Sequence, residues 1–217
     1  MPIEKTAAEI AEMIESGATL MIGGFLAVGT PETVVDAIVV KGIGSLTGIG
    51  NDTAFPGVGI GKLVRAGLLK KMIASHVGTN PETTASVEAG RMELELVPQG
   101  TLAERIRAGG AGLGGILTPT GVGTDVARGK TSLIVDGREY LLELPMNADF
   151  ALIHAECADV AGNLQYVGTT RNFNPIMAAA GKVVVAEVNS VIDGFFDPDQ
   201  IHTPGILVDY IVRRDGQ

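Results

Sequence analysis

Short apolar runs alternate along this sequence with amphipathic segments, and clusters of glycine separate the two. Residues 18–22 form one such run. The sequence TPE at 30–32 then supplies a threonine cap, a first-turn proline and an early acid for a helix that extends to residue 40. Strands that alternate with helices in this way pair in parallel. The sequence therefore predicts an α/β fold with an open, mostly parallel sheet and flanking helices.

The same cycle continues to the end of the chain. Further strands are predicted at residues 46–49, 72–74, 92–97, 150–153, 183–188 and 206–212, and further helices at residues 3–15, 81–89, 101–108 and 175–180. Asp136 and Gly137 suit a tight type I′ turn, so residues 132–135 and 138–143 are predicted to form a β-hairpin inserted in the α/β pattern. No internal repeat and no Pro/Ser-rich boundary divides the chain. We expect one domain over residues 1–217.

Charge and composition argue against several classes of function. The formal net charge is −9, which offers no basic surface for nucleic acid or an anionic membrane. The N-terminal sequence MPIEKTAAEI lacks the features of a signal peptide, and no uncharged apolar stretch reaches ~18 residues, so we expect a cytoplasmic protein. Cys157 is the single cysteine, and the three histidines show no metal-ligand spacing. A metal-free enzyme is expected.

Four predicted strands end in residues that suit a binding site: Gly23-Gly24, Asn51, His76 and Gln99-Gly100. Ligands of open α/β sheets bind beyond the carboxyl ends of the strands, so we expect these residues on one rim. Paired glycines let backbone N–H groups approach an anion or a thioester, and an amide at Asn51 or Gln99 could donate to an oxyanion. Each residue also has a plain structural interpretation as a turn, a cap or a packing glycine.

Other motifs in the sequence give weaker evidence of function. Residues 110–115 formally match G-x-G-x-x-G with Asp136 downstream, but a predicted helix precedes them, whereas a dinucleotide site needs a preceding strand. A P-loop is excluded because Gly61-Lys62 is followed by Leu63. Neither a G-x-S-x-G elbow nor a supported Cys–His pair occurs, so the chain shows no obvious nucleophile.

Several long blocks of the sequence resemble the α subunits of family I CoA-transferases. The blocks are GGFLAVGTP (23–31), GNDTAFPGVGIGKL (50–63), ASHVGTNPET (74–83), VPQGTLAERIRAGGAGLGG (97–115), TPTGVGT (118–124) and RNFNP (171–175). The likeness extends from near residue 3 to the last predicted strand.

This resemblance implies a fold shared with sugar-phosphate isomerases and a ping-pong exchange of CoA between short-chain acyl-CoA and acids such as acetate, acetoacetate and butyrate. In the family a glutamate attacks the acyl-CoA, and a glutamyl-CoA thioester forms through an acyl anhydride. That glutamate lies in a Ser-Glu-Asn-Gly block of the β subunit, and no such block occurs here. The implied partner is therefore a β subunit, in an α2β2 or larger assembly. Coenzyme A is implied as a substrate and not as a permanent cofactor.

The resemblance also assigns site residues. It implies that Asn51 and Gln99 are active-site amides close to the partner's glutamate, and that CoA is contacted by the loop Gly23, Gly24, Phe25, Leu26, Ala27, Val28 and Gly29. Two alternatives remain on a similar fold. One is a sugar-phosphate isomerase or ring deaminase with its own acid/base set, and the other is a regulatory sugar-phosphate sensor.

Overall fold

The computed structural model describes residues 1–214, most of which surround one large sheet. Within those residues the sheet has nine strands in the order β1-β12-β11-β9-β2-β3-β4-β5, with β10 beside β9. Every pairing is parallel except that of β10 with β9. The strands are β1 (Ile3–Glu4), β2 (Thr19–Ile22), β3 (Leu46–Ile49), β4 (Leu69–Ala74), β5 (Glu93–Leu96), β9 (Ala148–Ala158), β10 (Leu164–Gln165), β11 (Gly181–Val191) and β12 (Tyr210–Arg213). The predicted open, mostly parallel α/β sheet is confirmed.

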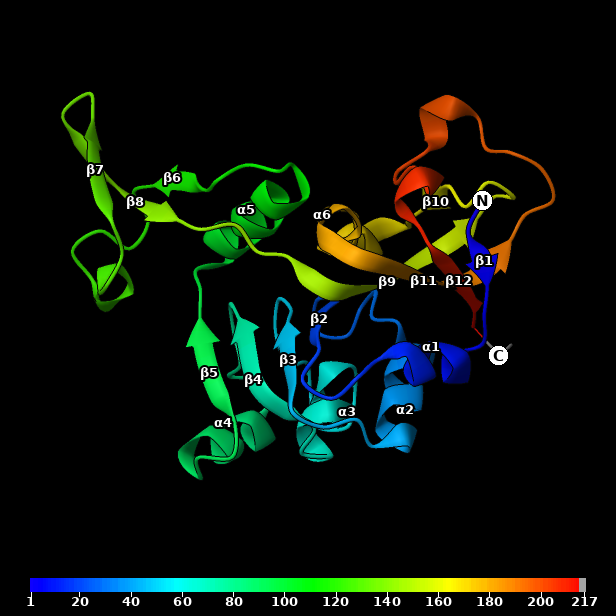
Figure 1. The fold of residues 1–217 in the computed structure, drawn as a ribbon, viewed down its shortest axis with the longest axis horizontal. Helices are drawn as coiled ribbons and strands as arrows, with labels where there is room; N and C mark the ends of the chain where they lie inside the picture. The colour runs from blue at the N-terminus through cyan, green and yellow to red at the C-terminus, as the bar shows by residue number, and fades with distance from the viewer. Residues whose placement is uncertain (215–217) are drawn as a thin grey trace.

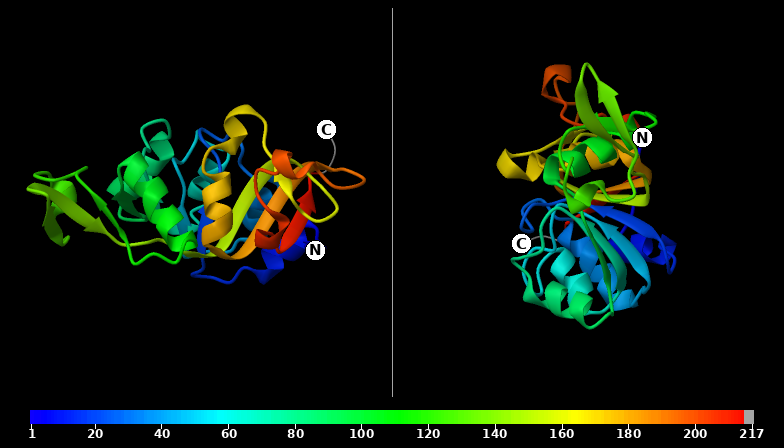
Figure 2. Two further views of the ribbon diagram at one scale, coloured as in Figure 1. Left: turned by 90° about the horizontal axis from the view of Figure 1, so that it is seen from above. Right: turned by 90° about the vertical axis from the view of Figure 1, so that its left-hand side faces the viewer.

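Helices cover both faces of this sheet (Figures 1 and 2). The helices are α1 (Ala7–Met13), α2 (Glu32–Lys41), α3 (Ile60–Arg65), α4 (Pro81–Glu88), α5 (Gln99–Gly110) and α6 (Asn174–Ala180), with short 3-10 turns at Asp125–Ala127, Gly168–Arg171, Pro198–Gln200 and Gly205–Leu207. Helices α1 to α4 bury residues such as Ile38 against one face, and α5 and α6 bury residues such as Leu102 against the other. Central strands such as β2 (TLMI) are covered on both sides and are therefore apolar runs in the sequence, whereas the edge strand β5 (ELEL) alternates with glutamate. In the described part of the chain, no helix has the length and hydropathy needed to cross a membrane.

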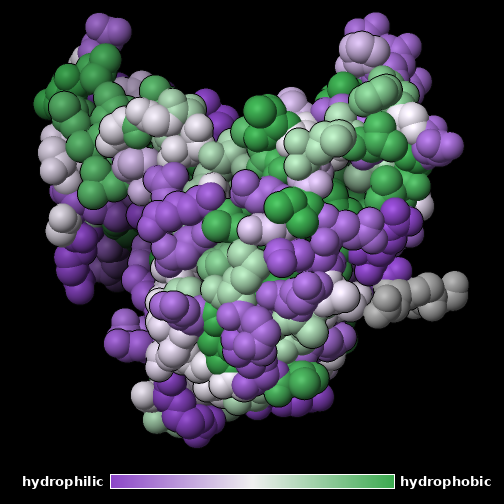
Figure 3. All heavy atoms as spheres, turned by 45° about the vertical axis from the view of Figure 1, so that its right-hand side comes forward, coloured by the Kyte–Doolittle hydropathy of each residue, from purple (hydrophilic) through white to green (hydrophobic). Residues whose placement is uncertain are grey.

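A second, three-stranded sheet projects from this body (Figure 1). It consists of β6 (Ile116–Thr118), β7 (Ser132–Val135) and β8 (Arg138–Glu143), and we call residues 116–143 the arm. The predicted hairpin is confirmed, with positive φ at both Asp136 (49°) and Gly137 (74°). β6 adds a third strand that the sequence analysis did not predict. Hydrophobic side chains gather on the surface of the arm (Figure 3), where Ile134 is 77% exposed.

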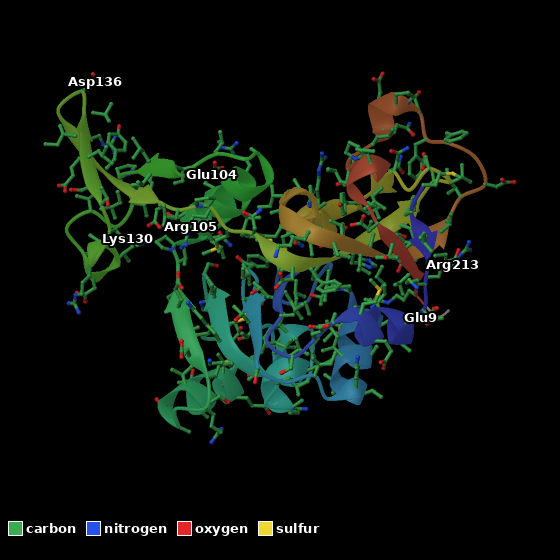
Figure 4. The ribbon with its side chains drawn as sticks, in the orientation of Figure 1. Glu9, Glu104, Arg105, Lys130, Asp136 and Arg213 are labelled. Atoms are coloured by element: carbon green, nitrogen blue, oxygen red, sulfur yellow. The ribbon has the colours of Figure 1, made fainter. Side chains whose placement is uncertain are left out.

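A buried carboxylate joins the arm to α5. Glu143 is 2% exposed and pairs with Lys130 of the arm. Arg105 of α5 stands 3.8 Å from the same carboxylate, and its guanidinium also donates to the Leu144 carbonyl at 2.8 Å. Figure 4 shows Arg105 and Lys130 near one another between α5 and the arm. These contacts fix the end of the arm relative to α5.

The first helix is shorter than predicted. Ile3 lies in β1 and pairs with Tyr210, and α1 begins only at Ala7. A capping box sets this start, because Thr6 Oγ1 accepts from the Glu9 N–H and the Glu9 carboxylate accepts from the Thr6 N–H. The prediction of one helix over residues 3–15 was therefore wrong at both ends.

The predicted threonine cap of α2 is also wrong. The Thr30 hydroxyl donates instead to the Gly23 carbonyl at 3.0 Å. The first turn of α2 is satisfied from β11, where Glu187 Oε2 accepts from the N–H groups of Thr33 (2.8 Å) and Val34 (3.1 Å). A residue more than 150 positions away thus takes the role that the local sequence suggested for Thr30.

Other elements also differ from the prediction, among them β9 and β11, which are each several residues longer than expected. α5 begins at Gln99, two residues earlier than expected, so Gln99 lies in a first helical turn and not in a loop. α3 was not predicted, because it is only six residues long and starts after Gly59 in an unusual backbone conformation. The last predicted strand is confirmed only from Tyr210 onward, since Gly205–Leu207 form a 3-10 turn.

Two residues of α2 test the placement of this core. Ile38 is fully buried and Val40 is 88% exposed. We expect Ile38→Ala to lower the free energy of unfolding by about 2–5 kcal/mol, through lost burial and the cavity left behind. Val40→Ala should change it by less than about 0.5 kcal/mol. Urea denaturation followed by circular dichroism measures both, and equal losses would contradict the buried face assigned to α2.

Candidate active site

The carboxyl ends of β2, β3, β4 and β5 meet along one edge of the sheet (Figure 1). Asp52, after β3, pairs with His76, after β4, in an isolated parallel bridge. Gln99, after β5, donates from Nε2 to Asn51 Oδ1 at 2.7 Å. The loop that follows β2 joins them, because the Leu26 N–H donates to Asp52 Oδ2 at 2.9 Å. The predicted rim of four strand ends is therefore confirmed.

Asn51 lies at the centre of a hydrogen-bonded set of side chains. It is 2% exposed, and its Oδ1 accepts from Gln99 Nε2 and from Ser75 Oγ, the latter at 2.9 Å. Its Nδ2 donates to Asp52 Oδ2 at 2.8 Å. Both ends of the amide are thus held, which fixes its orientation. Gln99 is exposed, and its side chain makes one hydrogen bond within residues 1–214, which leaves a second N–H on Nε2 available to a ligand.

The glycine loop after β2 is a tight two-residue hairpin. Phe25 and Val28 exchange backbone hydrogen bonds of 3.0 and 2.9 Å. The two residues between them, Leu26 (φ 48°) and Ala27 (φ 70°), occupy the left-handed region although neither is glycine. Such a conformation costs about 1–2 kcal/mol per residue, so surrounding contacts must hold it. The bond from Leu26 to Asp52 is one of these contacts.

Gly23 and Gly24 each have a packing reason to be glycine. A Cβ on Gly23 would lie 1.7 Å from Asn174 Oδ1, and a Cβ on Gly24 would lie 2.1 Å from Thr30 Oγ1. The Gly24 N–H already donates to Asn172 Oδ1 at 3.1 Å, and the Gly23 N–H donates to the Leu152 carbonyl at 2.9 Å. These two N–H groups are therefore used inside the protein. The packing role stands whether or not the loop also contacts a ligand.

Two asparagines that position this loop were missed as functional candidates. Asn172 Nδ2 donates to the Val28 carbonyl at 2.9 Å, and the fully buried Asn174 donates to the Gly29 carbonyl at 3.0 Å. Asn174 Oδ1 also accepts from the His154 N–H of β9. Because about 145 residues separate them from the loop, no local pattern predicts these contacts. Their only signal in the sequence is the RNFNP block at 171–175.

The acids next to the rim have structural partners. Glu32 accepts from the Gly59 N–H at 3.0 Å and pairs with Lys62 at 2.6 Å. Glu82 pairs with Arg65 at 2.9 Å. These contacts agree with the prediction that neither carboxylate is a nucleophile.

Three further titratable groups, Cys157, His154 and Glu187, are not activated for attack. Burial raises the pKa of the Cys157 thiol, which keeps it protonated at neutral pH. Burial lowers the pKa of His154 to about 4, so its ring is neutral, and burial raises the pKa of Glu187 beside it. Residues 1–214 contain no group of three His, Cys, Asp or Glu side chains that could hold a metal ion.

The G-x-G-x-x-G match does not form a dinucleotide site. Gly110 is the last residue of α5, so the motif follows a helix and not a strand. Asp136, the candidate acid, lies in the hairpin turn of the arm. The fold therefore gives no support to a dinucleotide-binding site at residues 110–115, which the sequence analysis had already judged unfavourable.

Known proteins are similar to this chain in both sequence and fold. The family model "Coenzyme A transferase" matches residues 3–214. The chain is 51% identical over 197 residues to the acetate CoA-transferase subunit alpha of Escherichia coli (strain K12), covering 90% of each chain. It is 49% identical over 206 residues to the acetoacetyl-CoA:acetate/butyrate CoA transferase alpha subunit of Clostridium acetobutylicum, covering 94% of each.

Solved structures agree on the fold. An acyl-CoA transferase from E. coli O157:H7, in a thioester complex with CoA, superposes with a TM-score of 0.87 at 24% identity. The match covers 98% of this chain and 47% of that one, so this chain corresponds to about half of it. Glutaconate coenzyme A-transferase from Acidaminococcus fermentans gives a TM-score of 0.83 at 22% identity, over 96% of this chain and 74% of that one. With a family model that matches nearly its whole length and relatives near 50% identity, the chain belongs to the coenzyme A transferase family.

Proposed function

We propose that this chain is the α subunit of a heteromeric CoA-transferase that exchanges CoA between short-chain acyl-CoA and carboxylates of the acetate, acetoacetate and butyrate class. The observation that carries the proposal is the exposed amide of Gln99, held by the buried Asn51 at a rim whose neighbouring glutamates, Glu32 and Glu82, are already paired with Lys62 and Arg65. The two relatives near 50% identity are both named as alpha subunits of such enzymes. Family membership favours this function over an isomerase, a deaminase or a sugar-phosphate sensor.

The chemistry suits neutral hydrogen-bond donors. A glutamate carboxylate of the partner subunit attacks the thioester carbonyl, and the resulting tetrahedral oxyanion collapses to an acyl anhydride and CoA thiolate. The thiolate attacks the glutamyl carbonyl of the anhydride, which releases the first acid as its carboxylate and leaves a glutamyl-CoA thioester. A second carboxylate then takes the CoA by the same steps in reverse. No step gains or loses a proton, so the site needs oxyanion donors and no general base.

Each part of the rim has a place in this scheme. Gln99 donates its second N–H to the oxyanion, and Asn51 acts through Gln99 by fixing its side chain. The loop from Gly23 to Gly29 contacts CoA, where Phe25 and Val28, each more than 40% exposed, offer apolar surface. Coenzyme A takes part as a substrate and not as a resident cofactor.

The β subunit supplies the nucleophile in an α2β2 or larger assembly in the cytoplasm. This chain has the length of the named alpha subunits, of which it covers 90% and 94%. The chain of the E. coli O157:H7 acyl-CoA transferase is about twice as long as this one, and the length beyond the match equals a second half of similar size.

Removing the Gln99 amide tests its role. In the assembled complex, Gln99→Ala should lower kcat by roughly 10²–10³-fold with a smaller change in KM, as expected for the loss of one oxyanion donor. Gln200→Ala is the matched control, since Gln200 is exposed in a 3-10 turn outside the rim. Steady-state assays of both variants measure the effect. An unchanged kcat in a correctly assembled Gln99→Ala complex would reject the role.

Chemical trapping locates the covalent intermediate. The complex is incubated with acyl-CoA and no acceptor acid, and borohydride then reduces any glutamyl thioester to the alcohol. After digestion, mass spectrometry should find the corresponding mass loss on a glutamate of the β subunit and none on this chain. Reduction of Glu32 or Glu82, the two glutamates closest to the strand-end loops of the rim in the sequence, would overturn the proposed division of roles.

A further inference from the structure

Strand β7 forms an exposed edge of the arm. The strands of the small sheet lie in the order β6-β8-β7, and no other strand within residues 1–214 lies beside β7. All four of its residues, Ser132–Val135, are exposed. The apolar side chains of Leu133, Ile134 and Val135 are 41%, 77% and 42% exposed. Successive side chains of a strand point to opposite faces, so apolar surface is exposed on both faces of the arm.

β7 lacks the features that usually protect an edge strand. Such strands typically carry a charge, a proline or a bulge, or are covered by another element. The sequence SLIV contains neither a charge nor a proline, and β7 pairs with β8 without a shift in register. Opposite charges flank it, since Lys130 precedes the strand and Asp136 follows it. Figure 4 shows Asp136 at the tip of the arm and Lys130 nearer the main sheet.

The hydrogen bonds of the arm identify the free backbone groups of β7. The Leu142 N–H of β8 donates to the Thr131 carbonyl at 2.8 Å. Bonded pairs alternate with non-bonded pairs in an antiparallel ladder, so Leu133, two residues further on, also bonds to β8. The N–H and C=O groups of Ser132 and Ile134 therefore point away from β8, toward the open edge.

Two copies of β7 match one another in an antiparallel register centred on Leu133. The free groups of Ser132 in one copy then face those of Ile134 in the other, and the reverse, so that both sets are satisfied. Lys130 of each copy lies opposite Asp136 of the other, and opposite charges meet at both ends of the pair. A register centred on Ser132 or Ile134 would instead separate Lys130 from Asp136.

The same register brings apolar side chains together. Leu133 of one copy lies directly opposite Leu133 of the other, on one face of the joined sheet. Lys130 already pairs with the buried Glu143. Its ammonium has three donors, so it can also bind the carboxylate of Asp136 from the other copy.

We propose that the β7 strands of two copies of this chain pair antiparallel about a two-fold axis and join the two arms into one continuous sheet. The edge complements itself in its free backbone groups and in its flanking charges, as a two-fold contact requires. A second copy of this chain, and not the β subunit, is therefore the occupant that the edge fits. The pairing rests on the two copies of this chain in the proposed α2β2 assembly, but it needs no transferase chemistry.

Disulfide trapping in the assembled complex tests the register. In the proposed pair, the two residues at 133 form a non-hydrogen-bonded pair with Cα atoms about 4.5 Å apart, which a disulfide can bridge. Leu133→Cys is made in a Cys157→Ser background, because Cys157 is the one cysteine of the sequence. Mild oxidation should link most copies of this chain in pairs, and mass spectrometry of the digest should find the bond between the two residues at 133.

Two further variants serve as controls. The two residues at 134 lie diagonally, about 7–8 Å apart, which is beyond the reach of a disulfide, so Ile134→Cys should stay largely reduced. Adding Ile134→Pro to Leu133→Cys removes an N–H that points away from β8 and leaves the ladder within the arm intact. This addition should lower the crosslinked fraction several-fold.

Three results would overturn the pairing. One is equal crosslinking at 133 and 134, which would indicate random encounters. Another is a Leu133→Cys chain that stays reduced, or that links only to a cysteine of the β subunit. The third is a complex that contains one copy of this chain by light scattering.

Transferase assays on the same samples separate the pairing from the proposed function. Because β7 lies outside the rim, the crosslinked complex should keep the activity of the reduced one. Linked arms in a complex without transferase activity would support the pairing and reject the function. An active complex with unlinked arms would reject the pairing alone.

Discussion

The buried carboxylate of Asp52 joins the loops that form the rim. It is 4% exposed, and its Oδ2 accepts from the Leu26 N–H and from Asn51 Nδ2 while its Oδ1 accepts from the Ala54 N–H at 2.7 Å. Two loops that follow neighbouring strands are thereby held to one another. The strained hairpin after β2 and the orientation of the Asn51 amide both depend on these bonds. Through Asn51 the same carboxylate also sets the position of Gln99.

The polar groups of the rim divide into supporting groups and exposed groups. Asn51, Asp52 and Asn174 are almost completely buried and satisfied within the chain, whereas Gln99 and His76 are exposed. A rigid buried set behind an exposed neutral donor is the arrangement that oxyanion stabilisation requires, because the donor loses little freedom when charge develops. The exchange reaction needs little else from this chain if the charged nucleophile comes from its partner.

The sequence predicted the features that depend on nearby residues. The alternation of strands and helices, the hairpin at Asp136 and Gly137, and the common rim of four strand ends all follow from local patterns and from the geometry of parallel sheets. The features that it missed depend on distant contacts. Glu187, and not Thr30, accepts the hydrogen bonds of the first turn of α2. Asn172 and Asn174 bind the carbonyls of the loop after β2, about 145 residues away. Gly23 and Gly24 are required for close packing against Asn174 and Thr30. Their spacing in the sequence could not distinguish this packing role from ligand binding.

We propose that this chain provides amide donors and binding surface while a β subunit provides the nucleophile. The most direct measurement is reconstitution from separately purified subunits, with this chain titrated by a partner that contains a Ser-Glu-Asn-Gly block. CoA transfer from butyryl-CoA to acetate is followed, and light scattering reports the assembly. We expect no transferase activity from this chain alone, and activity that rises with added partner to a maximum at equimolar subunits. Full activity from the purified chain without any partner would contradict it.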